Sequence, residues 1–397
     1  MSVPAKNLLV LSMLVSAGCA PSVSVSSPTP SPATSYLIRL GADTVAVEQF
    51  RRTGNHIESE IMQRSPVTYL GRSTIELGAN GLATSWTYDP RLVSGARPTG
   101  AATRMLTFGV DSSIIVSDTG AQFTRRIAGG PAIPNLPNSM LSWDLAVAYA
   151  RAQGRDSVNV PMIGAAGGRG TVPIRFITKD SVRSYYGGPN WPVYMKLDPQ
   201  GHIVWFDGTA TTIKILGTRV PNVEVRTLAS AFTVRDQTGG AMGAASPRDT
   251  ARVQINGSPI WIDYGRPALR GRNPFVNGVL GDTLWRTGAN AATQFQTPVD
   301  LMIAGQTIPA GKYTLWTHVF PQNSGYELIF NKQVGQWGAG PGTYDPKQDL
   351  VRVPLAMKRV ANSAERFTMM IEPSGDGGMI AMQWGTTRLE TPFTIKK

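Results

Sequence analysis

Short runs of apolar and β-branched residues, each ended by turn-forming residues, recur along almost the whole chain. Residues 36–40 are followed by Gly41, and residues 82–88 follow the pair Asn80-Gly81, which predicts a type I′ hairpin turn. The chain has 42 Gly and 29 Pro but only 16% charged residues, a composition that suits tight turns better than long surface helices. We therefore expect a mainly β protein with two antiparallel β domains.

Residues 36–238 are predicted to form an N-terminal β-rich domain, a β-meander with one or two helices. One helix is expected over residues 141–152, because this Ala- and Leu-rich stretch follows the N-cap residue Ser139 and stops at Gly154. A second, shorter helix is expected over residues 223–234. Strands are expected over residues 36–40, 45–50, 57–62, 75–77, 82–88, 105–108, 113–116, 172–177, 193–197 and 203–206.

The Gly- and Ala-rich residues 239–245 are expected to separate this domain from a second one at residues 246–397. In the second part, short strand-type runs follow one another with turn residues between them and no convincing helix. This pattern favours an antiparallel β-sandwich or jelly-roll-like domain. The runs are residues 252–255, 259–264, 301–303, 313–319, 326–330, 350–355, 367–371, 379–384 and 393–395.

The first 35 residues differ in composition and are not part of the predicted fold. Residues 1–18 have one basic residue and an apolar run before small residues, the pattern of a secretory signal peptide. Ala17-Gly18-Cys19 resembles the end of a bacterial lipoprotein signal, so we expect Cys19 to be acylated after cleavage. Residues 19–35, rich in Ser and Pro, are expected to form an extended tether.

The lipid anchor predicts a membrane partner and a location in the cell envelope, on its periplasmic or cell-surface face. No other apolar run approaches the roughly 18 residues that a membrane-spanning helix needs. Cys19 is the only cysteine, and three scattered histidines give no His/Cys metal site. The net charge is +12, but the sequence has no basic run or nucleic-acid-binding motif. We therefore expect no nucleic-acid partner, no metal and no cofactor.

Several short motifs occur in order in the C-terminal part of the chain. They are Ser246-Pro247-Arg248, Asp263-Tyr264-Gly265-Arg266-Pro267 with Gly271-Arg272, Trp285-Arg286-Thr287-Gly288-Ala289-Asn290 with Ala292-Thr293, Pro309-Ala310-Gly311-Lys312-Tyr313-Thr314-Leu315, Asn331-Lys332, Trp337-Gly338 and residues 349–352. Over residues 246–397 the chain thereby resembles the bacterial domain of unknown function 2911. Gly281-Asp282-Thr283 departs from the aromatic-glycine turn expected before the tryptophan motif. The resemblance implies a β-rich fold and no established activity. Residues 36–235 resemble the companion β-domain that precedes this module in some envelope proteins.

Four arginines, namely Arg266, Arg270, Arg272 and Arg286, lie close together in the sequence among Gly, Pro, Asn and Trp. Guanidinium groups this close repel one another unless acceptors pair with them. One interpretation is a ligand site, in which they bind an anion, a carboxylate or a sugar beside aromatic rings. The other is structural, with the arginines bound to loop carbonyls and Asp263 or Asp349 as counter-ion. The candidate ligand-binding residues are Tyr264, Arg266, Arg272, Trp285, Arg286, Asn290, Thr293 and His318.

His318 lies in a predicted strand that places it on one face with Thr314 and Trp316. It is either a general base near the arginines or a partly buried histidine bonded to backbone. No usable G-x-S-x-G or phosphate-loop motif is present, and we assign no catalytic residue. We expect a lipid-anchored binding or scaffolding protein of the bacterial envelope, whose ligand is a glycan, a lipid or another envelope protein. The alternative is a β-sandwich hydrolase acting on an envelope carbohydrate or ester through His318 or Asp263.

Overall fold

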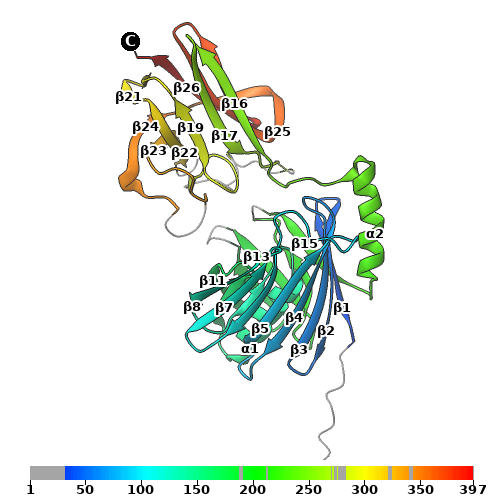
Figure 1. Ribbon diagram of the computed structural model, residues 1–397. Helices are drawn as coiled ribbons and strands as arrows, with labels where there is room; N and C mark the ends of the chain where they lie inside the picture. Colours follow the sequence, from blue (N-terminus) through cyan, green and yellow to red (C-terminus); the bar gives the residue numbers. More distant parts are fainter. Residues whose placement is uncertain are drawn as a thin grey trace, which may run out of the picture.

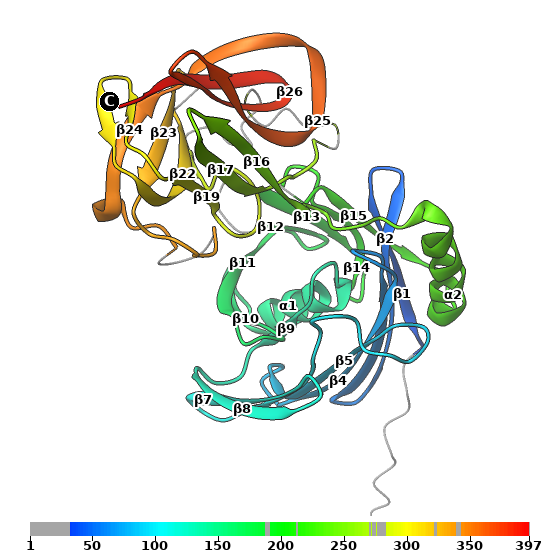
Figure 2. The same cartoon turned by 45° about the horizontal axis from the view of Figure 1, so that its top comes forward.

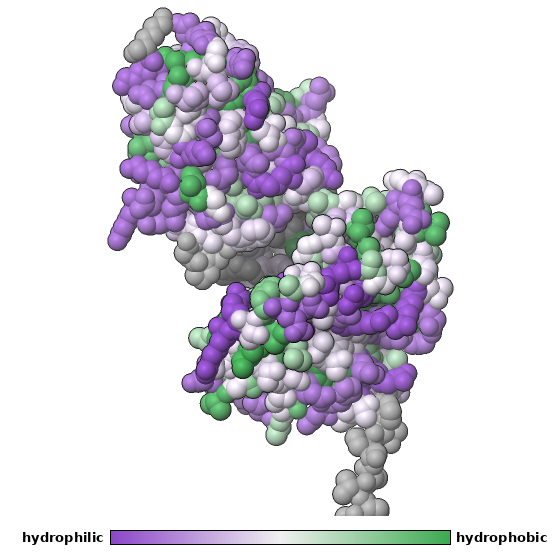
Figure 3. Space-filling model, in the orientation of Figure 1, coloured by the Kyte–Doolittle hydropathy of each residue, from purple (hydrophilic) through white to green (hydrophobic). Residues whose placement is uncertain are grey.

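The computed structural model describes residues 32–186, 191–211, 213–269, 271, 275, 283–320, 324–338 and 343–396. The described chain forms two bodies, an N-terminal body that ends with helix α2 (Val225–Arg235) and a C-terminal body that begins at Arg248 (Figures 1 and 2). The surface is hollowed where the two bodies meet (Figure 3). Within the described residues, no helix has the length and apolar character needed to cross a membrane.

Fifteen strands of the described chain form one sheet in the N-terminal body. Their bounds are β1 (Thr34–Leu40), β2 (Asp43–Thr53), β3 (His56–Gln63), β4 (Tyr69–Leu77), β5 (Ala83–Arg91), β6 (Thr103–Phe108), β7 (Ser112–Asp118), β8 (Gln122–Ala128), β9 (Ile133–Asn135), β10 (Ser157–Gly164), β11 (Arg169–Thr178), β12 (Ser181–Tyr185), β13 (Pro192–Leu197), β14 (Ile203–Asp207) and β15 (Ile215–Val220). The sheet runs from β8 down to β1, crosses to β15, and continues down to β9. Neighbouring strands are antiparallel except β9 and β10. The predicted meander is confirmed, and the β1–β15 pair joins its two halves.

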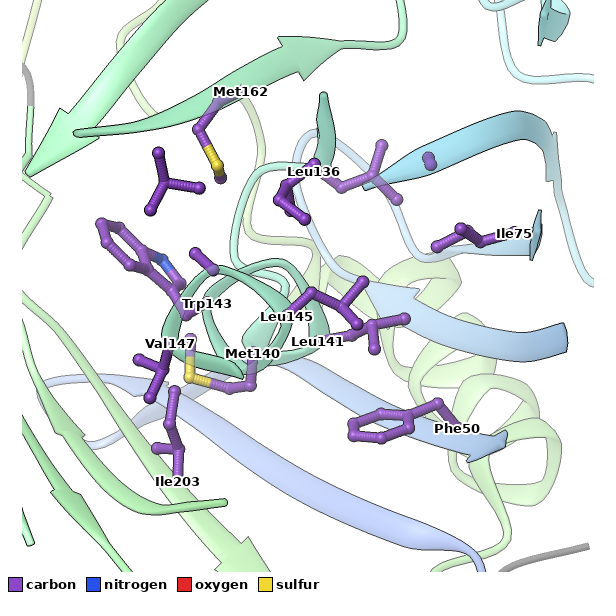
Figure 4. Packing of buried hydrophobic residues seen from close by; sticks show 14 of the residues in the cluster. Phe50, Ile75, Leu136, Met140, Leu141, Trp143, Leu145, Val147, Met162 and Ile203 are labelled. Carbon is purple, nitrogen blue, oxygen red and sulfur yellow. The ribbon is translucent and has the colours of Figure 1, made fainter. Parts of the chain in front are cut away.

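The curved sheet surrounds helix α1 (Met140–Ala152), as Figure 2 shows. The predicted N-cap is confirmed, because the Ser139 hydroxyl oxygen accepts a hydrogen bond from the Ser142 amide at 3.2 Å. Burial of the apolar side chains of α1 against the strands forms the core of the N-terminal body, which stabilises the fold by removing them from water. Figure 4 shows Met140, Leu141, Trp143, Leu145 and Val147 of α1 among Phe50, Ile75, Met162 and Ile203.

A buried carboxylate joins the sheet to the start of α1. Glu48 of β2 accepts hydrogen bonds from the backbone amides of Met140 and Leu141 at 2.6 and 3.0 Å, and from the Ser139 hydroxyl at 2.7 Å. These amides have no partner inside the helix, so the carboxylate satisfies donors that would otherwise be buried without one. Burial raises the pKa of the Glu48 carboxyl above its ordinary value.

Helix α2 packs on the outside of the sheet against β2, β3 and β4, and continues into the turn η1 (Asp236–Gly240). The guanidinium of buried Arg64 lies 4.1 Å from the ring centre of Phe232 in α2 and donates to the Gly240 carbonyl at 3.1 Å. The second predicted helix is thus confirmed. Its contacts tie the chain to the N-terminal body just before it crosses to the C-terminal body.

Two sheets of the described chain pack face to face in the C-terminal body and share one apolar core, so the predicted β-sandwich is confirmed. The first sheet contains β16 (Arg248–Ile255), β17 (Ser258–Gly265), β18 (Thr283–Trp285), β19 (Thr293–Thr297), β22 (Gly311–Val319), β23 (Tyr326–Asn331) and β24 (Asp349–Pro354), with the short 3-10 helix η3 (Pro346–Gln348) before β24. The second contains β20 (Leu301–Ile303), β21 (Gln306–Ile308), β25 (Ala356–Ser374) and β26 (Gly377–Ile395).

The hairpin predicted at Asn80-Gly81 forms between β4 and β5, but the predicted turn type is wrong. Gly81 has a φ of 77°, whereas Asn80 is not in the left-handed region that a type I′ turn needs at both central residues. Instead, the Gly81 amide donates to the Gly78 carbonyl at 2.9 Å, and the Asn80 side-chain oxygen accepts from the Leu82 amide at 3.0 Å. The side chain of Asn80 thus satisfies a backbone donor of the turn.

Candidate functional site

The loop at residues 285–290, which begins at the end of β18, is fixed by the side chain of Trp285. The indole nitrogen of Trp285 donates to the Gly288 carbonyl at 2.9 Å, and the Trp285 ring stacks on Trp384 with ring centres 5.8 Å apart. Both rings are buried in the core of the C-terminal body. The loop is therefore fixed to the sandwich at its first residue.

Thr287 in this loop has an unfavourable backbone conformation. Its φ is 52°, which is rare for a β-branched residue, and its side chain is fully buried. The Thr287 hydroxyl lies 2.8 Å from the Thr317 hydroxyl, and the Thr293 hydroxyl donates to the Thr287 carbonyl at 2.7 Å. These bonds hold the loop in a strained shape, which is a property that clusters at functional sites.

Two glycines let other backbone segments press against the loop. A Cβ atom on Gly265 would overlap the Ala289 carbonyl, and one on Gly338 would overlap the side chain of Arg286. The Gly338 amide also donates to the Asn290 carbonyl at 2.9 Å. The stem of Arg286 is thus confined by backbone on one side, which limits where its guanidinium can lie.

Arg286 is a partly buried cation without a counter-ion among the described residues. One of its terminal nitrogens lies 3.4 Å from the Gly338 carbonyl oxygen, and its Nε is buried with no hydrogen-bond partner. Burial lowers the pKa of the Arg286 guanidinium from its ordinary value, and no neighbouring carboxylate contributes to the shift. A buried charge without a partner is costly, so this position favours an anion.

Arg286 lines a cleft of about 810 Å³ between the two bodies, which we call the interbody cleft. Among the described lining residues it carries the only charged side chain. The walls on both sides are largely aromatic and aliphatic. Residues of the N-terminal wall include Leu40, Tyr69, Tyr186, Trp191, Ile213 and Ile215, and residues of the C-terminal wall include Leu284, Trp285, Trp316, Tyr344 and Trp384.

A second unused donor lies on the N-terminal wall of the interbody cleft. The side chain of Gln63 is almost fully buried, and its oxygen accepts from the Asn138 side chain at 3.1 Å. Its Nε2 atom has no hydrogen-bond partner. A buried amide donor without an acceptor is disfavoured, but protein atoms enclose this one, so the donors that face the cleft are those of Arg286.

Three of the candidate residues from the sequence, Trp285, Arg286 and Asn290, line the interbody cleft together. Tyr264 and Thr293 are buried, and they hold the C-terminal body and the 285–290 loop rather than lining the cleft. Arg272 and the predicted lipid-bearing Cys19 lie outside the described residues.

Of the two interpretations of the arginines, the structural one applies to Arg266. Its guanidinium pairs with Asp249 at 2.9 Å, and donates to the Phe367 carbonyl at 3.2 Å and to the Thr368 hydroxyl at 3.0 Å. These contacts tie β17 to β25 across the two sheets. The counter-ion is therefore Asp249, and neither Asp263 nor Asp349 has this role.

The two suggested counter-ions, Asp263 and Asp349, pair elsewhere: Asp263 with Arg248, and Asp349 with Arg352 at 2.7 Å. His318 is also outside the lining of the interbody cleft. Its ring lies 4.3 Å from the ring centre of Phe320, and its Nδ1 is 3.7 Å from the Glu327 carboxylate.

The sequence did not point to the N-terminal wall of the interbody cleft. Leu40 and Ile215 have ordinary strand contexts, and they come together through the β1–β15 pairing. Tyr344 and Trp384 are far from the arginine motif in sequence and reach the cleft only because the sandwich folds.

A second hollow, of about 630 Å³, lies beside α1 at one end of the N-terminal sheet, and we call it the helix hollow. Four of the five ionisable residues among its described lining residues pair with each other: Asp144 with the His202 ring at 2.9 Å, and Asp198 with Arg219 at 2.5 Å. The fifth, Arg52, donates to the Gly54 carbonyl at 2.7 Å. The hydrogen bond from Asp144 raises the pKa of His202 above its ordinary value. Since both carboxylates are paired and Arg52 already has an acceptor, the helix hollow has no comparable demand for a charged ligand.

Among the described residues, no group of three or more His, Cys, Asp or Glu side chains could hold a metal ion. The described lining residues of the interbody cleft offer apolar and aromatic contact together with hydrogen-bond donation from Arg286. This combination suits binding of an acceptor-bearing molecule.

Comparison with known proteins gives a family match for the C-terminal part of the chain. Residues 246–393 match the model of a protein family of unknown function, DUF2911. A β-barrel-like protein of the DUF1849 family from Brucella abortus has 10% identity and a TM-score of 0.33, covering 50% of this chain and 98% of that one. A DUF1089 family protein from Pseudomonas aeruginosa has 14% identity and a TM-score of 0.32, covering 42% and 91%. No curated protein matches the chain.

Proposed function

We propose that this chain, a DUF2911 protein in its C-terminal part, is a lipid-anchored binding protein of the bacterial cell envelope, whose interbody cleft takes a small apolar or amphipathic ligand. The observation that carries the proposal is the cleft itself. Both bodies contribute ring and aliphatic side chains to one hollow of about 810 Å³, which is within the usual size range of small-molecule sites.

The membrane anchor is supported by the sequence. Acylation of Cys19 after cleavage would hold the chain at a bilayer, and the Ser- and Pro-rich tether that precedes β1 would let the folded bodies move relative to the surface. A cleft near a membrane surface suits a ligand that partitions between water and lipid. The net charge of +12 adds attraction to anionic envelope surfaces.

Binding fits the geometry better than hydrolysis. The alternative hydrolase needs His318 or Asp263 beside the arginines, and neither residue lines the interbody cleft. Asp263 is already paired with Arg248. The arginine that does line the cleft, Arg286, therefore has no general base among the residues proposed from the sequence.

The ligand proposal is tested with the mature chain, residues 19–397, carrying Cys19→Ser so that no detergent is needed. Titration with decanol, decanoate and maltohexaose is followed by tryptophan fluorescence, since Trp285, Trp316 and Trp384 lie at the cleft. We expect the decyl compounds to bind with a Kd of about 1–100 µM and the sugar to bind much more weakly. Absence of binding by every decyl compound would contradict the proposal.

A matched pair of variants shows whether the signal comes from the cleft. Met242→Glu places a charge on the lining of the interbody cleft and should weaken decyl binding at least tenfold. Met357→Glu makes the same change on the exposed face of β25, outside the cleft lining, and should leave binding unchanged. Equal effects of the two variants would place the binding somewhere else.

The anchor is tested separately in cells by fractionation. The wild-type chain should be found with the membranes, and mass spectrometry of its N-terminal peptide should show an acylated Cys19. A mature N-terminus without acyl chains, in a protein released to the soluble fraction, would remove the lipid-anchored part of the proposal.

A further inference from the structure

We propose that the ligand of the interbody cleft is an amphiphile with one anionic head group, which pairs with Arg286 while its apolar tail lies against the N-terminal wall. This inference rests on the proposed binding function and names the class of ligand. Both a fatty acid and a lipid phosphate have this chemistry, and the experiment below distinguishes the two.

The electrostatics of the cleft select an anion. Arg286 is the only charged side chain among the described lining residues, and burial without a carboxylate partner disfavours its charged form. A carboxylate or phosphate in the cleft would supply the missing counter-charge. An uncharged molecule would leave the guanidinium buried as it is, and a cationic one would be repelled.

The surroundings of Arg286 restrict the position of its side chain before a ligand binds. The stem of Arg286 lies against Gly338, where a Cβ atom would overlap it. The neighbouring Thr287 is fully buried, and its carbonyl and hydroxyl both make hydrogen bonds. A cation held in place before binding loses little conformational entropy when it forms its bonds, which favours a well-defined bidentate contact.

The terminal nitrogens of Arg286 are the donors for such a contact. One of them makes only a long 3.4 Å contact with the Gly338 carbonyl, while Nε is buried within the protein. A planar carboxylate or two oxygens of a phosphate can accept from both terminal nitrogens together.

The N-terminal wall supplies the apolar half of the site. Leu40, Tyr186, Ile213 and Met242 line the cleft, are only partly buried, and pack against the core of the N-terminal body. They remain in contact with water when the cleft is empty of ligand. An alkyl tail lying over them would bury apolar surface and gain about 25 cal/mol for each Å² covered.

The experiment compares decanoate, decyl phosphate and decanol, which share one tail and differ in the head group. The probe is the mature chain with Cys19→Ser, at ligand concentrations below micelle formation, followed by calorimetry. Wild-type protein should bind at least one of the two anions about 10- to 100-fold more tightly than decanol. A preference for decanoate assigns the head group as a carboxylate, and a preference for decyl phosphate assigns it as a phosphate.

The arginine is tested with two variants of equal charge change. Arg286→Met keeps most of the side-chain volume and should remove the preference for the anions while leaving decanol binding unchanged. Arg226→Met removes a cation that is paired with Glu60 on the exposed side of α2, outside the cleft lining, and should preserve the preference. Arg286→Lys should retain part of the preference, because it keeps the charge but loses the planar fork.

The outcomes separate this inference from the proposed function. If decanol binds as tightly as both anions, or if Arg286→Met leaves the preference intact, the inference is overturned although the cleft still binds amphiphiles. If none of the three compounds binds the wild-type chain, the proposed function itself fails. A preference lost equally in Arg226→Met would show a long-range charge effect and would also overturn the inference.

Discussion

The helix hollow and the interbody cleft are similar in size but opposite in how they handle charge. In the helix hollow, Asp144 pairs with His202, Asp198 pairs with Arg219, and Arg52 donates to the Gly54 carbonyl, so each ionisable group among the described lining residues has a partner from the same body. In the interbody cleft, the single charged side chain among the described lining residues, Arg286, has none. The difference teaches that the number of ionisable groups in a hollow is a poor guide to function. Whether those groups are already paired is more informative.

Among the tests of this comparison, Asp144→Ala is expected to have the largest effect on the unfolding free energy. Asp144 is buried, and its oxygens accept from the Ile203 amide at 2.9 Å and from the His202 ring at 2.9 Å. Truncation leaves the Ile203 amide buried without an acceptor, so we expect unfolding free energy to fall by about 3 kcal/mol. Urea denaturation measures the loss, and decyl binding in the interbody cleft should be unchanged.

A control for this variant is Asp207→Ala. Asp207 accepts from the Thr209 amide within an exposed turn, so its loss should cost below about 1 kcal/mol. If the two variants destabilise equally, Asp144 does not have the structural role that its contacts indicate.

A smaller effect separates the two arginines of the cluster. Arg266 pairs with Asp249 and binds the Phe367 carbonyl, so Arg266→Met should lower unfolding free energy by about 1–2 kcal/mol. The ion pair is partly exposed, which keeps the expected cost modest. Chemical denaturation gives the value, and the binding preference for anions should survive. Loss of that preference together with wild-type stability would reverse the roles assigned to Arg266 and Arg286.

Much of the fold was predictable because its signals are local. The helix at Met140–Ala152 has a serine cap and an apolar face within its own sequence. The strand Gln122–Ala128 was missed, because it is almost entirely exposed and its residues show no apolar alternation. The strand Ser157–Gly164 was also missed, since Pro161 in its middle argues against a strand.

The candidate site was predictable only in part, for a physical reason. Trp285, Arg286 and Asn290 form a short continuous motif, so the sequence brings them together without help from the fold. Arg266 has an ionic partner, Asp249, whereas Arg286 has none among the described residues. The pairing of Arg266 with Asp249 depends on the register of β16 and β17. Single-sequence patterns do not contain that information, and they gave both arginines equal weight.

The pH dependence of stability gives a weaker test in the helix hollow. Asp144 raises the pKa of His202 in the folded chain above its unfolded value. Protonated His202 therefore stabilises the fold at pH values below its unfolded pKa of about 6.5, and this contribution is lost as pH rises through the higher folded pKa. The ring is about half exposed, so the contribution should stay below about 1 kcal/mol.

We expect the wild-type chain to lose this contribution as pH rises from about 6.5 through the higher folded pKa of His202, and His202→Gln to lack that part of the slope. Unfolding free energies of both chains across this range give the difference curve. His56 has a similarly raised pKa through Glu76 and remains in both chains, so it cancels in the comparison. A flat difference curve would show that the Asp144–His202 pair does not favour the protonated ring.

Arg286→Met is expected to change stability least and ligand binding most. Arg286→Met removes a desolvated cation that makes only one long hydrogen bond, so unfolding free energy should stay within about 0.5 kcal/mol of wild type or rise. Replacing a residue whose role is structural would lower the unfolding free energy and leave ligand binding unchanged, as we expect for Arg266. Denaturation curves for the two variants, measured beside their affinities for decanoate and decyl phosphate, place each arginine in one class. If Arg286→Met instead lost about 2 kcal/mol or more, its guanidinium would have a structural partner, and the contrast between the two hollows would no longer hold.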